Sequence, residues 1–203
     1  MGVSYKELGP ENIEGVKDQF NLLIVTATEI EKKELHGRLK PLDGESQIIK
    51  ISKAKYTYFL GKFGHYQAIH VACDDQGSTS RNGSITTTTD AINIWNPKAV
   101  LMVGIAFGVN KKKQKIGDVL VSERIVSYES QRLGAKKENR GKEGPGSSLM
   151  LNRFKSVTGW EHKIGVRTPA IIPGMILSGE KLVDDLDFRQ EFTVYVSITM
   201  SEW

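Results

Sequence analysis

Short, continuous runs of branched apolar residues constrain the fold of this chain more than any other feature. The first run, Leu22-Leu23-Ile24-Val25, is followed by residues 29–39, which carry apolar side chains at intervals and carboxylates in the first turn, as a helix does. A strand that is apolar at every position is buried on both faces, which is typical of a parallel sheet covered by helices. The second run, residues 99–103, leads into Gly104. The sequence therefore predicts an α/β fold.

The remaining segments complete this pattern. Gly64-His65 joins two β-rich stretches as a hairpin, and we interpret these stretches as part of an antiparallel insertion. Thr28 is placed as the N-cap of the first helix, and Ser178-Gly179-Glu180 turns the last strand into a short helix. Charged, glycine-rich residues 131–148 predict a mobile loop. The other expected elements are three β-rich stretches, a helix and two later strands, at residues 47–51, 55–63, 66–73, 84–94, 118–125 and 170–177.

The chain of 203 residues has the length and the 39% hydrophobic content of one ordinary domain. Residues 1–18 are polar and aperiodic, with Gly9-Pro10 as a breaker, and we expect a flexible leader there. The domain is expected to occupy residues 19–191. Residues 192–203 alternate in polarity and are expected to form an atypical strand-like tail.

Composition excludes several functional classes. With 28 basic and 24 acidic residues, the net charge of +4 is too small to indicate a nucleic-acid partner, and the basic run at 111–115 reads as a solvated loop. Cys73 is the single cysteine, and the four histidines lack metal-ligand spacing, so no metal and no cofactor are expected. The histidines are interpreted as surface or packed residues. No apolar stretch is long enough to span a bilayer, which makes the cytoplasm the expected location.

Ligands of open α/β sheets bind at the carboxyl ends of the parallel strands. Four segments of this chain either follow an expected strand or form a turn beside one. They are residues 27–31, 104–108, 117–118 and 178–183.

Taken in order, these segments resemble the nucleoside phosphorylase and methylthioadenosine/S-adenosylhomocysteine nucleosidase superfamily. The resemblance rests on a strand followed by an alanine and glutamates (residues 24–31), a strand entering a glycine-rich loop (102–108), Ile116-Gly117-Asp118-Val119, and Ser178-Gly179-Glu180. It covers roughly residues 20 to 185, and each motif alone is weak. It implies a three-layer, phosphorylase-like fold with a mixed central β-sheet flanked by helices.

The same resemblance implies a set of site residues. Glu31 corresponds to the family glutamate that helps to position the attacking water, although a first-turn glutamate can also simply complement the helix dipole. Two glycines would let the backbone approach a sugar and base, although they suit an ordinary turn as well. Asp118 is expected to stabilise a turn rather than to act as an acid. The expected substrate-binding residues are Ala27, Gly104, Ile105, Ala106, Phe107, Gly108, Leu182 and Val183. Core packing accounts at least equally well for Leu182 and Val183, and an aromatic residue beside a glycine, as at Phe107, more often packs in a core than on a base.

The sequence also departs from the family pattern. Phosphorylases of the superfamily carry an arginine just before the glycine loop, where this chain has Met102-Val103, and Arg81 is interpreted as solvated, so water is the expected acceptor. The family's Met-Glu pair and its later purine-protonating aspartate have no match after Glu191. We therefore expect the last strand and helix of the family fold to be missing from this truncated chain, and its activity to be weak or absent.

The resemblance leads to three hypotheses about function. The first is a purine nucleosidase domain that hydrolyses the N-glycosidic bond of an adenine nucleoside in full-length relatives, with a small-molecule nucleoside as partner and a homodimer as a possible assembly. The second is a non-catalytic module that binds a nucleoside or another protein. The third, and least favoured, is a phosphate-dependent nucleoside phosphorylase.

Overall fold

The computed structural model describes residues 3–73, 83–106, 113–127, 131–132, 138–139, 143–178 and 200–202. The chain divides into two compact units, residues 1–105 and residues 106–202. The expected domain at 19–191 therefore contains parts of both units. No helix in the described part of the chain is both long and apolar enough to cross a membrane.

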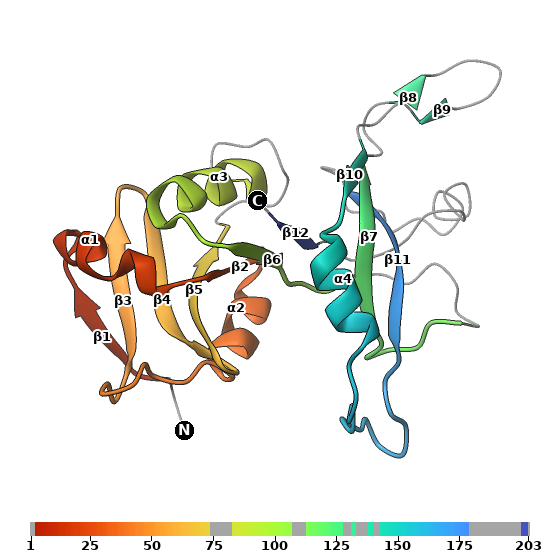
Figure 1. Cartoon of the computed structure of the whole chain (residues 1–203), viewed down its shortest axis with the longest axis horizontal. Helices are drawn as coiled ribbons and strands as arrows, with labels where there is room; N and C mark the ends of the chain where they lie inside the picture. The colour runs from red at the N-terminus through yellow and green to blue at the C-terminus, as the bar shows by residue number, and fades with distance from the viewer. Residues whose placement is uncertain are drawn as a thin grey trace. The chain divides into compact units, whose positions relative to one another are not determined.

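The first unit is a mixed sheet with short helices (Figure 1). Its strand order is β1-β3-β4-β5-β2-β6, in which β2 runs parallel to β5 and to β6, while β4 runs antiparallel to β3 and to β5. The strands are β1 (Tyr5–Leu8), β2 (Leu22–Thr26), β3 (Ile48–Lys53), β4 (Tyr56–Phe63), β5 (Tyr66–Ala72) and β6 (Ala99–Met102). The helices are α1 (Ile13–Val16), α2 (Glu29–His36) and α3 (Ser84–Trp95), with 3-10 turns at Pro10–Asn12 and Lys17–Gln19.

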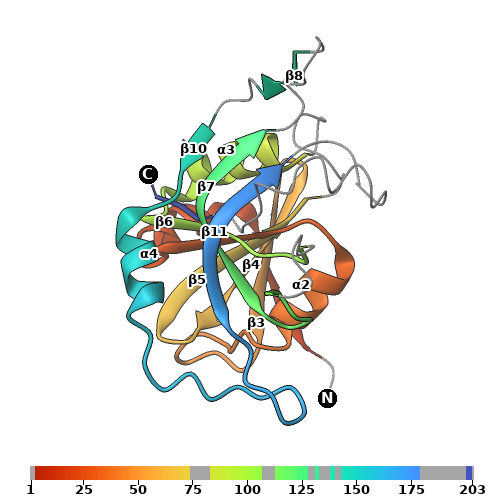
Figure 2. The same ribbon diagram turned by 90° about the vertical axis from the view of Figure 1, so that its right-hand side faces the viewer.

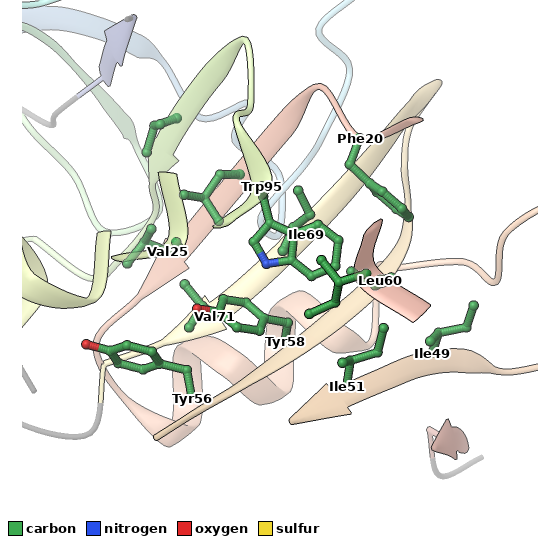
Figure 3. Packing of buried hydrophobic residues seen from close by; sticks show 14 of the residues in the cluster. Phe20, Val25, Ile49, Ile51, Tyr56, Tyr58, Leu60, Ile69, Val71 and Trp95 are labelled. Atoms are coloured by element: carbon green, nitrogen blue, oxygen red, sulfur yellow. The ribbon is translucent and has the colours of Figure 1, made fainter. Parts of the chain in front are cut away.

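Strand β2 is buried at every position, as the sequence predicted, because the two faces of the sheet are covered by different helices. Leu23 and Val25 pack into one core cluster, together with Ile13 of α1 and Trp95 of α3. Figure 3 shows Val25 and Trp95 within this cluster. Leu22 and Ile24 point to the opposite face, where Leu35 of α2 and Leu39 cover them. Successive residues of a strand face opposite sides, so the continuous apolar run produces three layers. The expected α/β class and mixed central sheet are confirmed.

The prediction of a flexible leader at residues 1–18 is wrong. Strand β1 pairs in parallel with β3, from Tyr5 opposite Ile48 to Leu8 opposite Ile51. Ile13 and Phe20 are almost fully buried in the first core cluster, and Val16 packs against that cluster. The spacing of these three apolar residues indicates a packed segment. It was missed in the sequence because Gly9-Pro10 was interpreted as a breaker. This segment is part of the folded unit.

The expected antiparallel stretches form as β3, β4 and β5, with a turn at 64–65 between the last two. They are not an insertion beside the sheet, however. Strand β5 pairs in parallel with β2 from Leu22 opposite Ala68 to Thr26 opposite Ala72, so the hairpin is continuous with the central strands.

The second unit contains a small sheet with the order β10-β7-β11 (Figure 2). Strand β11 runs parallel to β7, and its register shifts between Gly174 and Met175, directly after the Pro173-Gly174 pair. The described elements are β7 (Val119–Ser127), β8 (Gln131–Arg132), β9 (Glu138–Asn139), β10 (Glu143–Pro145), α4 (Ser148–Lys155), β11 (Ile171–Ser178) and β12 (Met200–Glu202).

The predictions for this half of the chain were less complete. The expected loop at 131–148 includes the short strands β8, β9 and β10, and helix α4 was not predicted at all. Ser147 caps α4 by accepting from the backbone N–H of Met150 at 3.1 Å. The turn expected at 179–180 and the tail up to residue 199 lie outside the described residues.

Candidate functional site

The start of helix α2 is fixed by a reciprocal pair of hydrogen bonds. The Thr28 hydroxyl accepts from the backbone N–H of Glu31 at 3.3 Å, and Glu31 Oε2 accepts from the backbone N–H of Thr28 at 2.9 Å. This is a capping box, which satisfies backbone donors that a helix leaves without partners in its first turn. The sequence prediction of Thr28 as N-cap is confirmed.

Glu31 also reaches the end of a second strand. Its Oε1 accepts from the backbone N–H of Ile105 at 2.7 Å, and its Oε2 accepts from the N–H of Ala27 at 2.9 Å. Strands β2 and β6 are parallel and in register, with Val25 opposite Met102, so the residues that follow them emerge at one edge of the sheet. The structure thus brings together two segments that the sequence placed at the carboxyl ends of parallel strands.

Gly104 makes this contact possible because it has no side chain. A Cβ atom at this position would lie 2.7 Å from Glu31 Oε1, well inside van der Waals contact. The carboxylate would then have to move away from the Ile105 N–H. From the sequence, a glycine was proposed here for the approach of a sugar and base, which stays a prediction; the neighbour that the structure shows is the Glu31 side chain.

The three backbone N–H groups leave the Glu31 carboxylate with spare acceptor capacity. An ionised carboxylate offers about four acceptor positions, of which the donors at Ala27, Thr28 and Ile105 use three. The side chain is only partly buried, and Ala27, Gly104 and Ile105 beside it are exposed. A carboxylate held in this way can accept one further hydrogen bond from a ligand O–H or a water molecule.

The other predicted site residues are only partly described. Ala106 is exposed and directly follows the segment that contacts Glu31. Phe107, Gly108, Leu182, Val183 and Arg81 lie outside the described residues. No cluster of metal-binding side chains occurs within the described ranges.

Asp118 stabilises a turn, as expected. Its carboxylate accepts from the backbone N–H groups of Lys115 at 2.7 Å and Ala170 at 2.9 Å, and it pairs with Arg167. These contacts lower the pKa of Asp118 to about 2, with the two backbone bonds contributing ahead of Arg167. A carboxyl group with such a low pKa is ionised at neutral pH and cannot serve as a general acid there.

A chain of hydrogen-bonded polar side chains, buried at Thr26, His36 and His70 and exposed at Tyr5, was not predicted. The Tyr5 hydroxyl lies 2.7 Å from His36 Nδ1, His36 Nε2 lies 2.8 Å from His70 Nδ1, and His70 Nε2 lies 3.0 Å from the Thr26 hydroxyl. Burial lowers the pKa of His36 to about 4 and that of His70 to about 3, so both rings are neutral at pH 7. Their separation of 34 residues gives no sequence signal, because only the pairing of β5 with β2 and the packing of α2 bring them together.

Comparison with known proteins places these observations in context. No family model matches the chain. Its sequence is 26% identical over 191 residues to a death domain-containing ATP nucleosidase of Amphimedon queenslandica, a match that covers 84% of this chain and 36% of that protein. It is 32% identical over 93 residues to an ATP nucleosidase of Escherichia coli, covering 41% of this chain and 17% of that protein. The chain therefore spans only about a third, or less, of the length of these relatives.

Solved structures are similar over most of the chain. They include the S-adenosylhomocysteine nucleosidase of Streptococcus pyogenes, with a TM-score of 0.65, 19% identity, and coverage of 91% of this chain and 73% of that one. The futalosine hydrolase of Helicobacter pylori gives a TM-score of 0.65 at 19% identity, covering 90% and 78%. The methylthioadenosine/S-adenosylhomocysteine nucleosidase of Colwellia psychrerythraea gives 0.67 at 17% identity, covering 90% and 73%. The chain has the fold shared by these solved nucleosidase and hydrolase structures.

Proposed function

We propose that this chain is the nucleosidase-fold part of a protein that hydrolyses the N-glycosidic bond of an adenine nucleoside or nucleotide. The observation that carries the proposal is the Glu31 carboxylate, which three backbone N–H groups hold at the edge where β2 and β6 end. The similarity to two ATP nucleosidases supports the reaction class and makes ATP a candidate substrate.

Hydrolysis of an N-glycosidic bond places specific demands on a site. As the bond to the purine breaks, positive charge develops on the ribose and the departing base takes the electron pair. A water molecule adds to the ribose carbon and loses a proton to solvent, and the departing purine takes up a proton, so the two transfers balance. In the proposed reaction, Glu31 accepts a hydrogen bond from that water, orients it and stabilises its developing positive charge. The three fixed N–H donors prevent the carboxylate from rotating away.

The purine leaving group needs a proton, and the family's aspartate for this step has no match in the sequence. Loss of general-acid assistance reduces rates by about 10²- to 10⁴-fold. We therefore propose that these 203 residues alone catalyse the reaction slowly. Turnover by the chain at about 10 s⁻¹, an ordinary enzymatic rate, would contradict this part of the proposal.

The test compares release of free adenine from ATP, adenosine and methylthioadenosine by the wild-type chain and by Glu31→Gln. A glutamine side chain retains an oxygen for the helix cap, but its amide NH₂ would meet the Ile105 N–H or the bound water as a second donor. The expected result is about a 100-fold or greater loss of adenine release. Glu34→Gln is the matched control, because Glu34 is an exposed glutamate on the same helix. Equal rates for Glu31→Gln and the control would refute the role of Glu31.

A second candidate is a non-catalytic module that binds a nucleoside. The capping box favours it, since helix α2 accounts for Glu31 without any chemistry. Calorimetry with adenosine and ATP distinguishes the two candidates. Binding without any adenine release, unchanged in Glu31→Gln, supports the binding module.

The phosphorylase remains the least favoured candidate, because Met102 and Val103 stand where a phosphate-binding arginine is expected. Adenine release that does not change when inorganic phosphate is added would exclude it. Phosphate-dependent release with formation of a ribose phosphate would support it.

A further inference from the structure

A cavity of about 380 Å³ lies in the first unit, on the side of β2 away from β6. It is lined by residues of β1, α2, β3, β4 and the end of β5, and by Lys55 between β3 and β4. Helix α2 contributes Glu29 and Lys32 to the cavity, whereas Glu31 of the same turn reaches toward β6. The cavity and the Glu31 edge therefore share the first turn of α2 but use different side chains.

The cavity wall carries more ammonium groups than carboxylates. Three lysines line it, Lys32, Lys50 and Lys55, whereas Glu29 is the one carboxylate among the described lining residues. Each ammonium group has an acidic neighbour: Glu29 lies 3.1 Å from Lys32, Glu7 lies 2.6 Å from Lys50 and Asp90 lies 3.9 Å from Lys55. Glu7 and Asp90 do not line the cavity, so they hold their lysines without filling the space.

The aromatic side of the cavity adds a polarisable hydroxyl. Tyr5 and Phe59 both line it, with ring centroids 5.4 Å apart. The Tyr5 hydroxyl is the outer end of the buried chain through His36 and His70 to Thr26. Burial raises the pKa of Tyr5, Glu29 raises it further and Lys50 lowers it, so this hydroxyl senses the charges of the cavity wall while staying protonated.

The chain of neutral groups can run in two directions. In one, Tyr5 donates to His36, and each histidine carries its proton on Nε2. In the other, Thr26 donates to His70, each histidine carries its proton on Nδ1, and the Tyr5 O–H is free to donate into the cavity. An anion near Tyr5 selects the second direction, because hydrogen bonds in a chain polarise one another. The buried histidines thus provide a donor facing the cavity without carrying charge.

We propose that this cavity is a binding site for a small phosphate-class anion, held by the ammonium groups of Lys32, Lys50 and Lys55 and by the hydroxyl of Tyr5. The anion is either the phosphate chain of a nucleotide whose sugar lies at Glu31, or a separate phosphorylated compound. The site does not depend on hydrolysis, so it is tested by binding alone.

Inorganic triphosphate is the first probe, titrated by calorimetry into the wild-type chain and into Lys50→Gln/Lys55→Gln. Loss of two lysine contacts in a partly desolvated site is expected to weaken binding by about tenfold or more. Lys6→Gln/Lys62→Gln is the matched control, because it removes the same charge from two ion-paired lysines that do not line the cavity. Affinity within twofold of wild type is expected there, because Lys6 and Lys62 do not line the cavity.

The outcomes separate clearly. Absence of triphosphate binding, or equal weakening in the two double variants, would overturn the proposal. Repeating the titration in Glu31→Gln separates it from the proposed function, because the cavity should bind triphosphate unchanged even if Glu31 is required for catalysis or has no catalytic role.

Two further binding experiments distinguish the phosphate chain of a nucleotide from a separate phosphorylated compound. If the cavity holds the phosphate chain of a substrate, ATP binds more tightly than adenosine, and Lys50→Gln/Lys55→Gln removes that advantage. If it holds a separate compound, adenosine and triphosphate bind together with unchanged affinities, and the double variant weakens triphosphate alone.

The direction of the hydrogen bonds from Tyr5 through His36 and His70 to Thr26 can be measured separately. In the triphosphate-bound protein, ¹⁵N NMR is expected to show His36 and His70 both protonated on Nδ1. Protonation of both rings on Nε2 in the bound state would contradict the assignment of Tyr5 as a donor to the anion. Tyr5→Phe removes this donor and should weaken triphosphate binding severalfold while leaving the lysines in place.

Discussion

At the scale of single residues, Glu31 and Gly104 form one unit of the candidate site. Glu31 was selected because the family resemblance matches it to the glutamate that positions the attacking water, and the structure shows its carboxylate in contact with the backbone that follows β6. Gly104 leaves room for that contact, since any larger residue would place a carbon atom 2.7 Å from Oε1. The two residues are far apart in the sequence, yet the position of the Glu31 carboxylate depends on the absence of a side chain at Gly104.

Gly104→Ala tests this dependence. The added methyl group should displace the carboxylate and break its bond with the Ile105 N–H, with a loss of about 1 kcal/mol in the free energy of unfolding. Urea denaturation measures the change. Gly15→Ala serves as the control, because a Cβ there meets no atom within 4 Å and an alanine in a helix is about 0.5–1 kcal/mol more favourable than a glycine. Equal stability of Gly104→Ala and wild type would show that the contact contributes nothing to folding.

At the scale of elements, helix α2 is the part of the site that the sequence defined best. Local rules determine its start, because Thr28 and Glu31 are three residues apart and each satisfies a backbone N–H of the other. Strands β2 and β6 were equally accessible to prediction, because a run of apolar residues is a local signal. Helix α4 was missed because it begins at the end of the charged, glycine-rich stretch 131–148, and the folded leader was missed because Gly9-Pro10 was interpreted as a breaker.

Thr28→Ala tests the cap. Removing the hydroxyl that accepts from the Glu31 N–H should lower the free energy of unfolding by about 1 kcal/mol. Thr28→Ser keeps the hydroxyl and should stay within a few tenths of a kcal/mol of wild type. Thermal and urea denaturation followed by circular dichroism provide the comparison. An alanine variant as stable as the serine variant would mean that the cap is not stabilising.

At the scale of the whole molecule, the first unit contains a pair of buried histidines that links its helices to its sheet. No local pattern indicated their contact, which depends on the strand order and on the docking of α2. The sequence could therefore predict which segments surround the site more readily than which polar groups lie behind it. The cavity beside them is a further consequence of packing, as its lysines come from α2, β3 and the turn before β4.

The histidine pair predicts how stability depends on pH. The pKa values of about 4 and 3 in the folded chain lie below the unfolded value near 6.5, so the unfolded state binds more protons as the pH falls below 6.5. The free energy of unfolding should therefore decrease between pH 6.5 and about pH 4, by up to about 1.4 kcal/mol per pH unit for each histidine. Above pH 7 these two residues should cause no change. Urea denaturation at several pH values measures the slope, and protonation of either ring near pH 6.5 in an NMR titration would contradict the prediction.

The capping box at Glu31 also affects how this position can change during evolution. Selection for a well-formed helix start is sufficient to retain a glutamate here, whatever becomes of the chemistry. A descendant that had lost hydrolysis would still be expected to keep Thr28 and Glu31, whereas Gly104, which the helix start does not need, would be retained only for the stability of the contact between Glu31 and the Ile105 N–H. Substitution of Gly104 with retention of Glu31 is thus the pattern that would distinguish an inactive descendant from an active one.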